Sequence, residues 1–150
     1  MGLMQRHGMR LTDMPELPEV ETVRRELATL LISRRLAKPL IYVEKCVHPN
    51  KEAYLLGVEN KTIVDVKRRG KFLLLELDDD HRLLFHLRME GKLFVVNKEH
   101  HSLSHLSLFI PFADIDMGLA FYDTRKFGVT YYLPKDEEGP LANVGKEPYD

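Results

Sequence analysis

The residues best suited to chemistry in this 150-residue sequence are a proline that directly follows a methionine, Met14-Pro15, and the adjacent Glu16. If Met14 is the initiator and is removed, Pro15 becomes a free secondary amine. An α-amino group has a reference pKa of about 7.7–8.0, so a useful fraction is unprotonated near neutral pH. Such an amine can attack an electrophilic carbon and form an iminium, and Glu16 is placed to move protons at the same carbon. Taken alone, the dipeptide has a plainer interpretation, which is methionine removal before a helix.

A basic turn, Lys67-Arg68-Arg69-Gly70-Lys71, separates two apolar runs. Its plain interpretation is a solvated turn. Its functional interpretation is that arginines such as Arg69 hold backbone phosphates while Lys71 points toward a reacting sugar. The apolar residues 72–75 would then hold Lys71 on a rigid strand.

Further candidates lie at the ends of later predicted strands. Phe127 would by itself be a core residue, but beside the cations Arg125 and Lys126 it is suited to intercalate between bases. His86 and Met89 end one strand and begin the next turn, and on residue type alone they would be a strand histidine and a core methionine.

The elements that must position these residues are mainly short strands. Pro18 suits the first turn of a helix, and apolar residues then recur at helical spacing up to about Arg34: Val20, Val23, Leu27, Leu30 and Leu31. Residues 51–56 suggest a short helix closed by Gly57. Apolar runs predict strands at 40–47, 62–67, 72–77, 83–87, 92–96, 103–110, 119–122 and 129–133. We therefore expect an α+β, mainly β fold: a β-sandwich of about eight strands with an N-terminal helix packed on it.

Composition limits the remaining possibilities. The net charge is −1, whereas a free-standing DNA-binding module is usually basic, so we expect DNA contacts to come from local clusters or from further protein beyond Asp150. The single cysteine, Cys46, allows no internal disulfide or cysteine-based zinc site. His100, His101 and His105 have no acidic or cysteine partner at ligand spacing, so we predict no metal. No apolar run approaches the roughly 18 residues of a membrane span, and we expect a cytoplasmic protein.

Five segments resemble one family. Residues 14–22 match, almost letter for letter, the N-terminus of bacterial formamidopyrimidine-DNA glycosylases. The family's later motifs are similar to RRGKFLLLEL (68–77), residues 86–93, Ser104-His105-Leu106 and residues 123–128, in the same order. The matches are incomplete: Arg88 and Glu90 are larger than the residues usual beside the methionine, and Leu103 stands where a first histidine would. Thr124 replaces a usual proline and Lys126 a frequent arginine.

The resemblance implies a bifunctional enzyme of base-excision repair acting on damaged double-stranded DNA. An oxidised purine, 8-oxoguanine or a formamidopyrimidine, is flipped out of the stack. The Pro15 amine displaces it at C1′, Glu16 protonates the sugar ring oxygen, and Lys71 assists. The iminium then permits β,δ-elimination of the strand. The implied DNA contacts are His86, Met89, His105, Arg125, Lys126, Phe127 and Arg69, of which Met89, Arg125 and Phe127 fill the vacated space.

The same comparison implies a domain plan. We expect a leader at 1–13 that is disordered or a misassigned start, an N-terminal catalytic domain at 14–134, and the start of an interdomain linker at 135–150. The family's C-terminal half carries a helix–two-turn–helix module and a zinc finger, and neither is in this sequence, so no cofactor is expected in this chain. We expect a monomer.

Two alternatives stay open. An endonuclease VIII-type glycosylase for oxidised pyrimidines shares the proline nucleophile, but its opening typically reads Pro-Glu-Gly-Pro-Glu, whereas Leu17 stands here. A non-catalytic DNA-binding fragment is the other. A chain that retains residues 1–14 is expected to be inactive, because its Pro15 nitrogen is a tertiary amide.

Overall fold

The structure is a computed structural model, and it describes residues 25, 27–88 and 91–143. Pro15, Glu16 and Met89, which the sequence predicts to be functional, lie outside the described residues. The part of the chain that the structure describes contains no helix long and apolar enough to cross a membrane.

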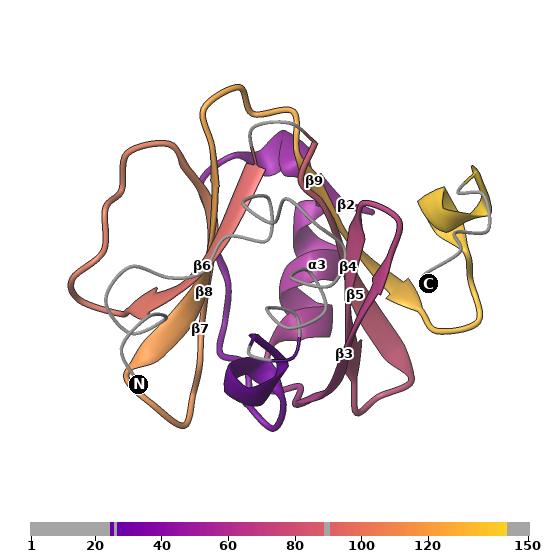
Figure 1. Ribbon diagram of the computed structural model, residues 1–150, viewed down its shortest axis with the longest axis horizontal. Helices are drawn as coiled ribbons and strands as arrows, with labels where there is room; N and C mark the ends of the chain where they lie inside the picture. Colours follow the sequence, from indigo (N-terminus) through magenta and orange to yellow (C-terminus); the bar gives the residue numbers. More distant parts are fainter. Residues whose placement is uncertain (1–24, 26, 89–90, 144–150) are drawn as a thin grey trace.

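Two β-sheets form a sandwich, as predicted (Figure 1). One sheet has five strands in the order β2-β9-β5-β4-β3, formed by Val47–His48, Val129–Pro134, His81–His86, Phe72–Leu77 and Ile63–Arg69. The other has four strands in the order β1-β7-β8-β6, formed by Leu40–Ile41, Leu106–Pro111, Met117–Asp123 and Gly91–Asn97. Neighbouring strands are antiparallel except for β2 and β9, which are parallel.

The main core lies between the two sheets. Along β4, the alternation of side chains sends Leu73, Leu75 and Leu77 into this core. The rings of Phe85 in β5 and Phe121 in β8 meet edge to face across it, with centroids 5.9 Å apart. The sandwich is therefore closed by contacts between sheets, and the strand ends that carry the candidate residues rest on a packed core.

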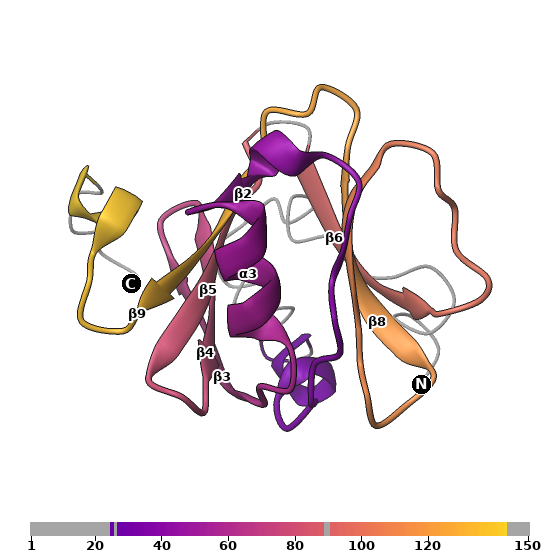
Figure 2. The same cartoon turned by 180° about the vertical axis from the view of Figure 1, so that it is seen from behind.

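Helical segments cover the sandwich. Residues 27–31 are helical, with Leu27 and Leu31 buried in the core, which confirms the last part of the predicted N-terminal helix. Helix α3 (Lys51–Val58) begins where the Asn50 side chain accepts a 2.8 Å hydrogen bond from the Ala53 N–H. It packs against β2 and β9 (Figure 2).

Gly57 lies inside α3 and does not end it, contrary to the prediction. The reason is tertiary packing: a Cβ at this position would lie 2.2 Å from Cε2 of Tyr132, so only glycine lets the helix approach β9 this closely. The helix continues to Val58, and Asn60 then turns the chain with a φ of 71°.

The predicted strand 40–47 is divided. Its first part, β1, pairs with β7 in one sheet, and its last part, β2, pairs with β9 in the other. Because one strand cannot pair within both sheets, the 3-10 turn η2 (Glu44–Cys46) carries the chain across. The described part of the chain therefore has nine strands, against about eight expected.

A second 3-10 turn, η3 (Gly139–Asn143), follows β9 and was not predicted. Its Leu141 is fully buried against Phe72, Leu74 and Leu84 on the outer face of the five-stranded sheet. Figure 1 shows this segment on the side of that sheet that faces away from the four-stranded sheet.

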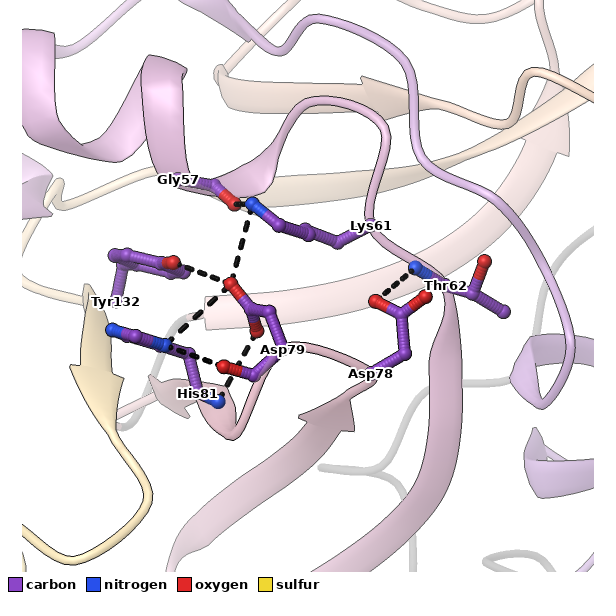
Figure 3. Close-up of polar contacts among 7 residues, drawn as sticks. All are labelled: Gly57, Lys61, Thr62, Asp78, Asp79, His81 and Tyr132. Atoms are coloured by element: carbon purple, nitrogen blue, oxygen red, sulfur yellow. Dashed lines mark hydrogen bonds and ion pairs between the residues drawn. The ribbon is translucent and has the colours of Figure 1, made fainter.

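The β4–β5 turn is fastened by Asp79 (Figure 3). Its Oδ2 accepts a 2.7 Å hydrogen bond from the Tyr132 hydroxyl and lies 3.2 Å from Lys61 Nζ. The His81 ring stacks on Tyr132 at 4.6 Å. Burial acts to raise the pKa of Asp79, but the hydrogen bonds from Tyr132 and Lys61 and the charges of Lys61 and His81 outweigh it and lower that pKa. This network anchors the end of the sheet away from the candidate residues.

Candidate nucleic-acid interface

The described candidate residues gather at one end of the sandwich. In the five-stranded sheet, Phe72 pairs with His86, and His86 pairs with Val129. Lys71 directly precedes Phe72, and residues 123–128 directly precede Val129. These segments therefore meet at the same end of the strands β4, β5 and β9.

The four-stranded sheet adds its loops at the same end. Asp123 pairs with Gly91 at the start of β6, and its N–H donates a 2.9 Å hydrogen bond to the carbonyl of His105. Strand pairing in both sheets therefore brings together Lys71, predicted to be catalytic, the predicted DNA contacts His86 and His105, and the loop 123–128.

The β3–β4 turn presents Lys71 as an exposed side chain. Gly70 makes the turn with a φ of 59°, a conformation that glycine adopts without steric cost. Arg68 donates to the Gly70 carbonyl and braces the turn from within. Arg69 Nη1 lies 3.2 Å from Glu138 Oε1, so this predicted phosphate contact has a carboxylate partner in the structure.

His86 is half-buried at the end of β5, and its ring meets the Phe72 ring edge to face at 4.6 Å. Among the described residues, its Nδ1 is buried and has no hydrogen-bond partner. Burial lowers the pKa of His86, and the positive charges of Arg88 and Lys71 lower it further. The His86 imidazole is therefore harder to protonate than an ordinary histidine, and a nearby anion would favour its protonation.

The β5–β6 turn is closed by a 2.8 Å hydrogen bond from the Gly91 N–H to the Leu87 carbonyl. A Cβ at Gly91 would lie 2.4 Å from that carbonyl oxygen, so glycine is required for the closure. Arg88, inside the turn, has a φ of 59°, an uncommon conformation for a residue with a side chain.

The β8–β9 loop presents its aromatic side chain to solvent. Phe127 is 57% exposed, so it is not a core residue. The guanidinium carbon of Arg125 lies 5.3 Å from the centroid of its ring, within the range of a cation–π contact. Lys126 between them has a φ of 60°. An exposed ring held beside a cation is suited to enter a base stack.

His105 is exposed and has a φ of 63°. The predicted strand 103–110 therefore begins later than expected, because β7 starts at Leu106, after this residue. His101 is used differently: its ring stacks on Phe109 at 4.4 Å and its Nδ1 lies 2.8 Å from the Asn97 carbonyl. Within residues 25, 27–88 and 91–143, no three metal-ligating side chains form a group that could hold a metal ion.

Asp123 is a buried residue of the candidate interface to which sequence reasoning assigned no role. Its side chain is buried, with the residue 1% exposed, and both carboxylate oxygens accept backbone N–H groups of the β8–β9 loop. The available signal was an aspartate at the start of a turn, since such residues accept hydrogen bonds from N–H groups a few positions later.

The fold and this end of the molecule define a β-sandwich domain that presents cations, histidines and one aromatic ring on neighbouring loops. The model of the formamidopyrimidine-DNA glycosylase N-terminal domain matches residues 14–130. The formamidopyrimidine-DNA glycosylase of Pediococcus pentosaceus is 41% identical over 138 residues, covering 90% of this chain and 50% of the relative. That of Cytobacillus firmus is 40% identical over 143 residues, covering 91% of this chain and 51% of the relative.

Solved structures of one such glycosylase have a similar fold. A complex of the Lactococcus lactis Fpg protein with DNA containing Fapy-dG superimposes with a TM-score of 0.75 at 37% identity, over 85% of this chain and 47% of that one. A complex of the same protein with DNA containing an abasic site gives the same TM-score, 0.75, at 37% identity, with the same coverage of 85% and 47%. The chain belongs to the formamidopyrimidine-DNA glycosylase family, and it spans about half the length of the curated relatives it matches.

Proposed function

We propose that this chain is the catalytic N-terminal domain of a bifunctional DNA glycosylase, which removes oxidised purines and cleaves the resulting abasic strand. Family membership supports the proposal, and so do the relatives whose structures contain DNA with Fapy-dG or an abasic site. The main observation behind the proposal is the exposed Phe127 ring beside Arg125. It lies on a loop at the same end of the five-stranded sheet as Lys71 and His86.

The proposed chemistry begins at Pro15. Its secondary amine attacks C1′ of the damaged nucleotide and forms a covalent bond as the base leaves, while Glu16 protonates the sugar ring oxygen. The amine nitrogen loses its proton, and the C1′–O4′ bond then breaks at the protonated ring oxygen, which opens the sugar and leaves an iminium. The iminium acidifies C2′, so that β-elimination and then δ-elimination break the strand. This route needs neither a metal nor an organic cofactor. Lys71 stabilises charge or donates a proton at the lesion.

The proposed DNA contacts divide into two groups. Arg125 and Phe127, together with Met89, fill the space left by the flipped base. His86, His105, Lys126 and Arg69 contact phosphates. Arg69 exchanges Glu138 for phosphate at low cost, because their ion pair is solvent-exposed and such pairs contribute about 0–1 kcal/mol.

The domain plan is part of the proposal: a leader at 1–13, the catalytic domain at 14–134, and a segment from 135 onward that leads toward a second DNA-binding half. We further propose that the protein is a monomer that acts in the bacterial cytoplasm. The relatives that share the domain are bacterial.

Excision of 8-oxoguanine and of thymine glycol from otherwise identical duplexes tests the proposed substrate. The intact natural protein with Pro15 as its first residue should remove 8-oxoguanine faster. Faster removal of thymine glycol would instead identify an endonuclease VIII-type enzyme. Binding of both duplexes without excision of either would identify a non-catalytic DNA-binding protein.

A further inference from the structure

Asp123 lies where the loops of the candidate interface converge. Its backbone pairs with Gly91, which closes the β5–β6 turn. Its N–H donates to the His105 carbonyl, before β7. Its side chain is directed into the β8–β9 loop, where Oδ1 accepts the Arg125 N–H at 3.0 Å and Oδ2 accepts the Gly128 N–H at 2.6 Å. One residue thus connects three loops.

The carboxylate sets the path of the β8–β9 loop. The two N–H groups that it binds lie on either side of Lys126 and Phe127, so the loop is held at both ends around its exposed aromatic residue. The loop has little room to relax at Gly128, because a Cβ there would lie 2.5 Å from Cζ of Phe121 and 2.9 Å from Oδ2 of Asp123.

The buried carboxylate of Asp123 has no ion-pair partner among the described residues. Burial of an ionised carboxylate is costly unless the carboxylate is hydrogen-bonded. The negative charge of Asp123 also acts on the buried thiol of Cys46: burial raises the pKa of Cys46 to about 12, and Asp123 contributes to this increase. Two backbone donors offset this cost. What the arrangement supplies is a defined loop conformation rather than a large gain in stability.

We propose that Asp123 is a positioning residue for recognition of the damaged site, acting through Phe127 and Arg125 and not through contact with DNA. This inference rests on the proposed function. In this proposal, Asp123 is needed for the protein to bind a duplex that lacks a base more tightly than an intact duplex. The reason is that only the duplex with a missing base has a space that the Phe127 ring can fill. Affinity for intact DNA, which phosphate contacts dominate, depends little on Asp123.

The test measures fluorescence anisotropy of two labelled duplexes that differ only in a tetrahydrofuran abasic analogue, with the intact natural protein. Asp123→Asn keeps the size of the side chain but replaces one acceptor oxygen with an amide that faces an N–H donor. The preference for the abasic duplex should fall about tenfold, as expected for loss of a charged hydrogen bond. Asp79→Asn is the matched control: it removes a hydrogen-bonded carboxylate at the opposite end of the sheet and should leave the preference unchanged.

A second comparison separates positioning from general damage to the fold. If Asp123 acts through Phe127, then Asp123→Asn should lower the preference little further in a Phe127→Ala background. Full additivity of the two substitutions, or an Asp123→Asn protein that keeps its preference within about twofold, would overturn the inference. A wild-type protein with no preference for the abasic duplex would overturn the proposed function, and this inference with it.

Discussion

The backbone N–H of Gly128 donates a 2.6 Å hydrogen bond to Oδ2 of Asp123, five residues earlier in the chain. This bond joins the start of β9 to the end of β8, so a loop with an exposed aromatic ring is fixed to one strand of each sheet. Sites supported by rigid strands and buried hydrogen bonds hold their geometry more closely than sites on unsupported loops.

Gly128→Ala should therefore destabilise the protein by about 1–3 kcal/mol, the usual cost of overpacking a filled interior. The added methyl group would meet the Phe121 ring and the Asp123 carboxylate. Urea unfolding measures the change, and the preference for abasic over intact DNA should fall with it. An unfolding free energy within about 0.5 kcal/mol of wild type would show that the loop adjusts freely.

His86 should make DNA binding depend on pH. The pKa of His86 is below its ordinary value in the free protein, and a bound phosphate would raise it, so binding takes up a proton. Affinity for duplex DNA should increase as the pH falls from about 7.5 to about 5.5, through the ordinary histidine range. Anisotropy titrations at constant ionic strength measure this.

His86→Gln should flatten part of that pH dependence, and His81→Gln, at the other end of the sheet, should not. An identical pH dependence in wild type and His86→Gln would show that His86 does not contact phosphate. The stability of the DNA-free protein should depend on pH in the opposite direction. The folded state binds a proton at His86 more weakly than the unfolded chain does, so His86 lowers folding stability as the pH falls below about 6.5.

Asp79 should contribute stability that is lost in acid. Its pKa is lowered below the ordinary value for an aspartate, so its contribution to stability is present above that ordinary pKa and disappears as the pH falls through the folded-state pKa. Asp79→Asn should cost about 1–3 kcal/mol at pH 6, and the difference from wild type should shrink by pH 3. Urea unfolding at both pH values measures it.

Asp114→Asn is the control for Asp79, because Asp114 forms an exposed pair with Arg34 and should change stability by less than about 1 kcal/mol. If Asp79→Asn costs the same free energy at pH 3 and pH 6, then the Tyr132 and Lys61 contacts do not favour the ionised carboxylate.

Much of the fold is predictable because local signals agree with it. Strand β4 was predicted with the observed bounds, since the run 72–77 is apolar and lies between a glycine turn and three aspartates. The exposed loop carrying Phe127 was predicted from the charges beside that ring.

Features set by distant residues were missed. The division of residues 40–47 depends on pairing with β7 and β9, and the continuation of α3 through Gly57 depends on Tyr132. Asp123 appears in sequence as a solvated turn residue, and its burial arises from the strands around it. For Pro15, Glu16 and Met89, the sequence prediction stays a prediction.

Borohydride trapping tests the central claim most directly. An oligonucleotide duplex containing 8-oxoguanine is incubated with two forms of the intact natural protein, one that begins at Pro15 and one that retains residues 1–14. We predict a covalent adduct only with the form that begins at Pro15, because an amide nitrogen cannot form the iminium. Trapping by a verified uncleaved Met1 form, or no adduct from either form when both are folded, would contradict the proposed mechanism.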